Sequence, residues 1–299
     1  MSRRTSSTTL AQRQVRVAAI TGGARGIGLA TAHAFAREGL AVAIGDLDAA
    51  TADAAAAQVA AATGAQVRAY VLDVSDLDSM AAFVDAAERD LGPIDVFDNN
   101  AGIMPVGPFL DETAASTKRQ LDVNVVGVLN GVRTVLPRFI ERRRGHLINV
   151  ASMAGRTGLA GTATYCGTKH FVVGFTESIR AELQAAGHPI HVSVVMPAVV
   201  RTELTDGLGA PRGVSPVTPE QVADAIVDAV RRPRFDVPVP RVAGTLVDIA
   251  TLLPRRAKDG MARITGADHL MLEVDATQRR SYELRAGAGA LPPKATGSD

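Results

Sequence analysis

The chain has 299 residues and a formal net charge of +1, with 46% hydrophobic and 21% charged residues, a composition typical of ordinary globular proteins. A net charge this close to zero argues against nucleic acid as the main partner, because nucleic acid requires a concentrated basic surface. The single cysteine, Cys166, excludes an intrachain disulfide, and the six histidines show no metal-ligand spacing, so we expect no metal. The longest apolar runs are shorter than the roughly 18 residues that span a bilayer. Residues 1–14 are basic and hydroxyl-rich, which indicates a flexible terminus rather than a leader, so we expect a cytoplasmic protein.

Strand-like apolar runs alternate with alanine-rich helical stretches from residue 15 to about residue 240. The runs lack in–out alternation, as is typical of parallel strands that are covered by helices on both faces. The predicted strands are 15–20, 41–46, 66–72, 94–98, 146–151, 190–196 and 235–240. The predicted helices are 26–38, 49–62, 76–91, 113–142, 162–186 and 219–232. This alternation predicts an α/β fold with a doubly wound parallel sheet (Rossmann fold) of about seven strands.

No linker interrupts the alternation, so we expect a flexible segment 1–14 followed by a single domain at 15–241. Within the domain, 203–219 is rich in glycine and proline, which predicts a mobile lid over the site. Beyond the domain, we expect a partly helical C-terminal extension at 242–285 and a disordered tail at 286–299.

One helical stretch of the extension carries an apolar face formed by Val242, Leu246, Ile249, Ala250 and Leu253. A basic cluster follows this face. Three explanations are open: packing on the parent domain, contact with another subunit, or contact with a membrane surface. Packing is the default, and membrane contact is not favoured because the segment is short and the net charge is near zero. In the first two cases the extension would line the substrate cleft and favour a bulky, apolar substrate.

Directly after the first predicted strand comes the glycine-rich segment TGGARGIG, residues 21–28. A tight turn without side-chain bulk brings backbone N–H groups and a helix N-terminus towards a pyrophosphate. The predicted cofactor-binding residues in this turn are Thr21, Gly22, Arg25, Gly26, Ile27 and Gly28. A carboxylate, Asp46, ends the second strand 20 residues after Gly26, where it can accept hydrogen bonds from ribose hydroxyls and would repel a 2′-phosphate. Arg25 could favour a phosphate instead, but Asp46 should lie nearer the ribose, so we predict NAD as the cofactor.

Further along, Tyr165 and Lys169 are four residues apart, which places both side chains on one face of a helix. Ser152 precedes Tyr165 by thirteen residues. A nearby ammonium group, together with the positive nicotinamide ring, favours the phenolate and lowers the phenol pKa towards working pH, as proton transfer from an alcohol requires.

In the order and spacing of these motifs, residues 15 to about 240 resemble the short-chain dehydrogenase/reductase family. The resemblance implies that Asn124, Ser152, Tyr165 and Lys169 are catalytic. Lys169 would also bind the nicotinamide ribose, Ser152 would stabilise charge on the substrate oxygen, and Asn124 would hold a water that links Lys169 to solvent. The further cofactor-binding residues that it implies are Asp73, Val74, Asn100, Ala101, Gly102, Pro197, Val200 and Thr202, with Tyr165 and Lys169.

Three positions depart from the family pattern. Ala198 stands where glycine is usual, which should slightly restrict the backbone beside the nicotinamide. Asp98 replaces an apolar residue in the fourth strand, and a buried carboxylate there would need a partner. Cys166 replaces the commoner residue beside Tyr165, and we expect this difference to have no effect on activity.

These features predict an oxidoreductase that transfers a hydride between NAD(H) and a secondary alcohol or ketone, with Tyr165 as acid/base. Two alternatives remain: a non-catalytic NAD-binding sensor or scaffold, and an epimerase or dehydratase on the same fold. The expected partner is a small-molecule substrate. Apolar positions on helices 113–142 and 162–186 further suggest a homodimer or homotetramer.

Overall fold

The computed structural model describes residues 9–11, 14–205, 207, 216–251, 253–257, 260, 271–272 and 276–286. Most of the predicted lid at 203–219, most of the N-terminal segment 1–14 and nearly all of the predicted tail at 286–299 lie outside the described residues. Their predicted mobility therefore stays a prediction.

Seven parallel strands form one sheet in the order β3-β2-β1-β4-β5-β6-β7, which confirms the predicted α/β doubly wound fold. The strands are β1 (Val17–Thr21), β2 (Ala41–Asp46), β3 (Val67–Val71), β4 (Val96–Asn99), β5 (His146–Val150), β6 (His191–Pro197) and β7 (Asp236–Val239). From β1 the chain runs outward through β2 and β3, and from β4 it runs outward in the opposite direction. The carboxyl ends of β1 and β4 therefore form the topological switch point, where ligands bind in open α/β sheets.

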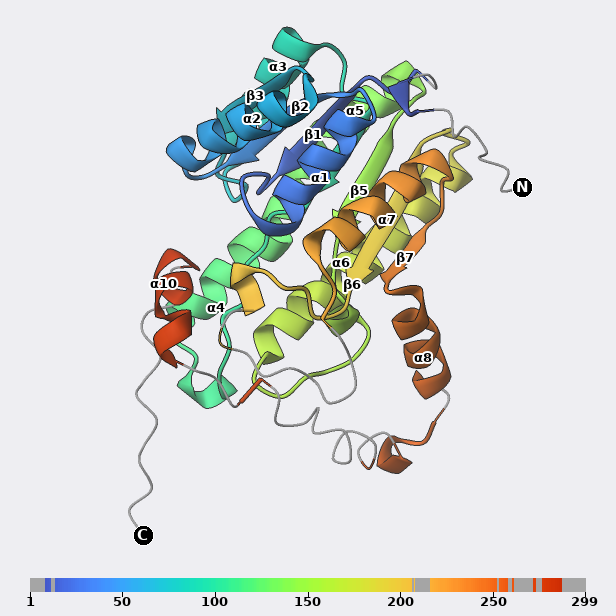
Figure 1. Ribbon diagram of the computed structural model, residues 1–299. Helices are drawn as coiled ribbons and strands as arrows, with labels where there is room; N and C mark the ends of the chain where they lie inside the picture. Colours follow the sequence, from blue (N-terminus) through green and yellow to red (C-terminus); the bar gives the residue numbers. More distant parts are fainter. Residues whose placement is uncertain are drawn as a thin grey trace, which may run out of the picture.

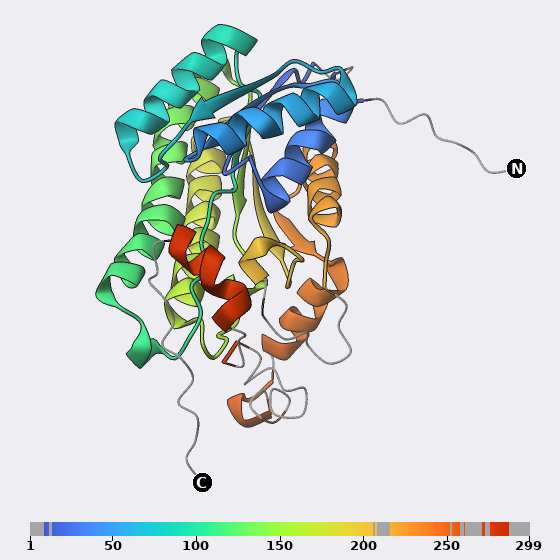
Figure 2. The ribbon, with the colours of Figure 1, turned by 60° about the vertical axis from the view of Figure 1, so that its left-hand side comes forward.

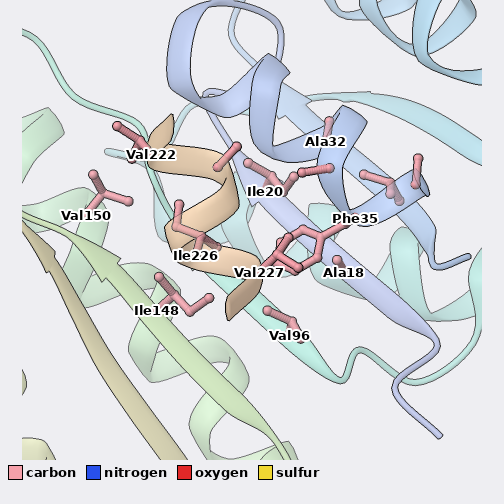
Figure 3. Packing of buried hydrophobic residues seen from close by; sticks show 14 of the residues in the cluster. Ala18, Ile20, Ala32, Phe35, Val96, Ile148, Val150, Val222, Ile226 and Val227 are labelled. Carbon is pink, nitrogen blue, oxygen red and sulfur yellow. The ribbon is translucent and has the colours of Figure 1, made fainter. Parts of the chain in front are cut away.

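Helices cover both faces of the sheet and bury a separate apolar core on each (Figure 1). The first core lies under α1 (Gly26–Arg37), α2 (Ala49–Thr63) and α7 (Pro219–Arg231). The second lies under α3 (Leu77–Leu91), α5 (Gly127–Arg142) and α6 (Ala163–Ala185). In the first core, Phe35 of α1 and Ile226 of α7 gather with Ile20 and Ile148 of the sheet (Figure 3).

The start of α7 shows how local sequence positions these helices. Thr218 and Gln221 form a reciprocal capping box, and Pro219 occupies the first turn, where its missing N–H costs nothing. Val222 and Ile226, four residues apart, then point to the core and are fully buried. The apolar spacing thus orients the helix on the sheet.

The predicted helix 113–142 is interrupted. It consists of α4 (Ala114–Leu121), a π-helical turn η3 (Asp122–Val126) and α5. Asn124 lies in the π turn and is fully buried. Such turns within helices are frequent at functional sites.

The extension contains α8 (Arg241–Thr251) and α10 (Ala276–Ala286). Helix α8 packs against β7, and its Val247 contacts the second core. The default expectation for its apolar face is nevertheless wrong, because Val242, Leu246 and Ile249 are 61%, 60% and 56% exposed. Among the described residues, no helix is long and apolar enough to cross a membrane.

Candidate functional site

A cavity of about 640 Å³ opens at the carboxyl ends of the strands. Its walls come from the β1–α1 turn, the ends of β2, β4, β5 and β6, and α10 of the extension. Most of the residues predicted for the site line this one cavity; Thr21, Gly28 and Asn124 lie behind its wall.

The β1–α1 turn has the geometry that a pyrophosphate site needs. Gly22 has a φ of +61°, and a Cβ atom there would lie 2.9 Å from the Cα of Ala101. A Cβ atom on Gly28 would lie 2.2 Å from the carbonyl oxygen of Gly22. Both positions therefore require glycine. The N-cap residue of α1, Arg25, makes no side-chain hydrogen bond to the first turn, so the backbone N–H groups of the helix can bind an anion.

Thr21 and Asn100 fix the turn to the end of β4. The hydroxyl of Thr21 accepts hydrogen bonds from the backbone N–H groups of Asn100 and Ala101, both at 3.1 Å. The Asn100 amide in turn donates to the carbonyl oxygens of Thr21 (2.9 Å) and Gly22 (3.0 Å). These bonds stiffen the switch point at which the cofactor would lie.

Asp46 at the end of β2 lines the cavity and accepts a hydrogen bond from the backbone N–H of Ala24 at 3.2 Å. The Arg25 guanidinium is directed elsewhere: it donates to Thr51 at 2.9 Å and to Glu203 at 3.3 Å, and it lies 3.6 Å from Asp48. Two carboxylates thus lie beside Arg25, and both the Arg25 side chain and the Asp46 carboxylate line the cavity. Asp73 and Val74 continue this wall after β3.

Tyr165 and Lys169 lie one turn apart on α6 and are both buried, with Tyr165 7% and Lys169 4% exposed. The Lys169 Nζ donates to the carbonyl oxygen of Val150 at 2.9 Å and lies 5.7 Å from the centre of the Tyr165 ring. Ser152 follows β5, and its hydroxyl accepts from the backbone N–H of Ala154 at 3.1 Å. All three side chains border the cavity.

Burial raises the pKa of Tyr165 to about 12, although a hydrogen bond with Ser152 acts in the opposite direction. Burial also lowers the pKa of Lys169 to about 8, so the ammonium form still dominates at neutral pH. The protein's own groups thus place the Tyr165 pKa above its ordinary value. The predicted lowering would require the positive charge of a nicotinamide ring in addition to Lys169.

Asn124 ties the π turn to its surroundings. Its amide oxygen accepts from the backbone N–H of Ile103 at 2.8 Å, and its nitrogen donates to the Ile103 carbonyl (2.9 Å) and to Thr168 (3.1 Å). A Cβ atom on Gly102 would lie 3.3 Å from this amide oxygen and 3.4 Å from the Lys169 Nζ. The Asn124 side chain therefore holds the loop after β4 against α6, and the predicted water-holding role stays a prediction.

Pro197, at the end of β6, and Val200 and Thr202, which follow β6, line the cavity. A Cβ atom on Gly26 would lie 3.2 Å from the Thr202 side chain, so this segment closes against the glycine turn. Ala198 is not among the described non-glycine residues with a left-handed φ, and the absence of glycine there causes no backbone strain of that kind.

Asp98 is fully buried in β4, and among the described residues neither of its carboxylate oxygens has a hydrogen-bond partner. The predicted partner is therefore not found in this part of the chain. Burial instead raises the pKa of Asp98 to about 8, so that the carboxyl group stays protonated over most of the neutral range.

Sequence patterns do not indicate one wall of the cavity, which is formed by Met271 and by Tyr282, Arg285 and Ala286 of α10. The extension does reach the cavity as predicted, but through these residues; the described residues of α8 do not line it. The buried face of α10 includes Arg279 and Glu283, which hydropathy would place in solvent. The apolar spacing therefore predicted that α8 would line the cavity, whereas α10 does.

Comparison with protein families identifies the chain. The family model described as short chain dehydrogenase matches residues 16–212. The chain belongs to this family. Among curated relatives, the 1-deoxy-11-beta-hydroxypentalenate dehydrogenase of Streptomyces exfoliatus is 40% identical over 228 residues, which is 74% of this chain and 82% of that protein. The galactitol 2-dehydrogenase of Agrobacterium fabrum is 41% identical over 189 residues, 63% of this chain and 72% of that enzyme.

This chain matches less than half of another curated relative. The probable oxidoreductase EphD of Mycobacterium tuberculosis is 39% identical over 256 residues, and the match spans 79% of this chain but only 43% of that protein. Two solved structures of short-chain dehydrogenases, each 27% identical, share the fold. The Burkholderia phymatum protein in complex with NAD has a TM-score of 0.72, with 78% of this chain and 92% of that chain covered. The Sphingobium yanoikuyae protein in complex with NADPH has a TM-score of 0.69, with 83% and 95% covered. The family thus supports an oxidoreductase with a nicotinamide cofactor.

Proposed function

We propose that this protein is an NAD(H)-dependent dehydrogenase that interconverts a bulky, apolar secondary alcohol and its ketone, with Tyr165 as acid/base. One observation carries the proposal: Ser152, Tyr165 and Lys169 border the same cavity as the glycine turn and Asp46. A single ligand-binding space therefore joins a proton-transfer group to a dinucleotide site.

Each residue has a part that follows from its position. When bound, the nicotinamide would supply the acceptor or donor of the hydride that leaves or reaches the carbinol carbon. In alcohol oxidation, the Tyr165 phenolate takes the hydroxyl proton as the carbonyl forms. Ser152 donates a hydrogen bond to the substrate oxygen, where negative charge develops. Lys169 lies 5.7 Å from the centre of the Tyr165 ring, and its positive charge together with that of a bound nicotinamide would favour the phenolate.

Asp46 and Arg25 support NAD over NADP. The Asp46 carboxylate lines the cavity and would repel a 2′-phosphate, whereas the Arg25 guanidinium is already engaged by Asp48, Thr51 and Glu203. The substrate end of the cavity supports an apolar substrate, because Met104, Met153, Leu159, Leu204 and Met271 line it.

The test is a screen of apolar secondary alcohols with NAD and with NADP, followed through the absorbance of the reduced nicotinamide. The proposal predicts turnover with NAD and a preference for large apolar alcohols over small ones. Binding of NAD without turnover of any alcohol or ketone would favour a sensor or scaffold, and conversion of a substrate without net reduction of NAD would favour an epimerase or dehydratase.

A further inference from the structure

Helix α10 covers the substrate end of the cavity. It lies beside the carboxyl ends of the strands, close to α4 (Figure 2). The buried face of α10 is formed by Arg279, Tyr282, Glu283 and Ala286, of which Tyr282 and Ala286 line the cavity. A segment far from the glycine turn in sequence thus completes the site.

A buried arginine fixes α10 to both sides of the cavity. The guanidinium of Arg279 donates to the carbonyl oxygen of Met104, after β4, at 2.8 Å and to that of Leu204, after β6, at 2.9 Å. It also donates to Glu283 at 2.9 Å and lies 4.9 Å from the centre of the Tyr282 ring. A fully buried charge is tolerated only when such bonds satisfy it, so these contacts anchor α10 to the segments after β4 and β6.

These contacts orient the phenol of Tyr282. Its oxygen accepts a hydrogen bond from the backbone N–H of Met104 at 2.7 Å, and its side chain is 8% exposed. A phenol can also donate one hydrogen bond. Among the described residues, no hydrogen-bond acceptor for this proton is found. Burial raises the pKa of Tyr282, although the Met104 N–H and the Arg279 guanidinium act in the opposite direction, so the phenol keeps its proton at neutral pH.

The reacting oxygen of the substrate does not need this donor. A carbonyl oxygen has two lone pairs, and under the proposed function Tyr165 and Ser152 bind both of them. The Tyr282 proton therefore remains for another acceptor in the same cavity.

We propose that Tyr282 is a specificity-determining residue that donates a hydrogen bond to a second oxygen of the substrate. The substrate class is a hydroxyketone or diol on an otherwise apolar skeleton, because the surrounding wall is formed by residues such as Met104, Leu204 and Met271. This inference rests on the proposed function and narrows its substrate.

The test compares a linear medium-chain ketone with the hydroxyketones that carry one hydroxyl group at successive carbons of the same chain. The wild-type protein should prefer one hydroxyketone over the parent ketone. Tyr282→Phe should lower kcat/KM for that hydroxyketone about tenfold, mainly through KM, and should change kcat/KM for the parent ketone by less than about twofold. A wild-type protein without preference, or an equal loss on all substrates in the variant, would overturn the proposal.

Two other tyrosines serve as controls. Tyr70 lies on β3, where its hydroxyl donates to Asp90 at 3.1 Å, and Tyr70→Phe should leave every substrate unchanged. Tyr165→Phe should lower turnover of ketone and hydroxyketone alike, by about 10²–10⁴ or more. If the wild-type protein reduces none of the compounds, the proposed function fails, and calorimetric binding of the same series then tests Tyr282 alone. The role of Tyr282 is supported if the wild type binds one hydroxyketone more tightly than the parent ketone and Tyr282→Phe loses this difference. Equal binding of all compounds by the wild type overturns it.

Discussion

Replacing Asp98 with valine should stabilise the protein, and the gain should grow with pH. Asp98 pairs in register with Ile20 of β1 and Ile148 of β5, so its carboxyl group shares a sheet face with two isoleucines of the first core. Neither carboxylate oxygen has a partner among the described residues. Valine is an apolar side chain of similar size, and it removes a buried polar group whose desolvation cost is not offset by any hydrogen bond among the described residues.

The magnitude follows from the pKa of this group. Burial raises the Asp98 pKa from 3.8 to about 8. Between these values the folded protein binds a proton that the unfolded chain has released, so the free energy of unfolding falls as pH rises. The slope is about 1.4 kcal/mol per pH unit, and over roughly four units the loss reaches up to about 6 kcal/mol. In Asp98→Val this contribution disappears.

Urea unfolding of the wild type and Asp98→Val at several pH values between about 4 and 8 measures the difference. The variant should be more stable at neutral pH, and its advantage should shrink towards pH 4. Asp98→Asn should remove the same pH dependence while it keeps an unpartnered amide. An advantage of Asp98→Val that does not change with pH, or a natively folded Asp98→Val that is less stable than the wild type, would show that Asp98 is not a buried carboxyl group without a partner.

Asp95 on the loop before β4 provides a control of opposite sign. It is also buried, but its carboxylate accepts hydrogen bonds from the backbone N–H groups of Arg16 (2.6 Å) and Val17 (3.3 Å) and pairs with Arg144. Asp95→Asn should therefore destabilise the protein. If Asp95→Asn loses stability and Asp98→Val gains it, the effect of burying a carboxyl group depends on whether the group has hydrogen-bond partners.

Two further predictions concern the cofactor and the assembly. Replacing Asp46 with alanine and the exposed Leu47 with arginine should raise the ratio of kcat/KM for NADP over NAD by at least about tenfold, because this removes a repulsive charge and adds a charge-assisted hydrogen bond. Asp53→Ala, on the exposed side of α2, is the control and should leave this ratio unchanged. A wild-type protein that already prefers NADP would contradict the role of Asp46. Light scattering at micromolar concentration should show a dimer or tetramer, since α4 and α6 leave Leu121 44% and Phe171 36% exposed; a monomer would contradict this expectation.

The sheet, and the meeting of most candidate cofactor-binding residues at one cavity, were predictable because they depend on local patterns. Continuous apolar runs indicate buried parallel strands, and strand order places the residues that follow these strands at one edge. Glycine at positions 22 and 28 reflects backbone contacts that no side chain allows, which the motif already suggests. Tyr165 and Lys169 needed only helical spacing to be placed together.

The rest depends on long-range contacts that sequence patterns do not contain. Arg279 is fully buried because carbonyl groups at Met104 and Leu204, 175 and 75 residues away, bind it. The apolar face of α8 predicted burial, yet Leu246 is 60% exposed, since amphipathic spacing does not show whether a covering surface exists. The π turn at Asn124 likewise has no signal in helical periodicity.

Turnover by Tyr165→Phe shows whether the Tyr165 hydroxyl is the acid/base. The variant keeps the ring and removes only the hydroxyl group, so thermal unfolding and NADH binding should match the wild type. Reduction of NAD with the best alcohol from the screen should fall by about 10²–10⁴ or more, whereas Tyr70→Phe should retain wild-type turnover. Near-wild-type turnover in a folded Tyr165→Phe protein that binds NADH would contradict the assignment of Tyr165 as the acid/base.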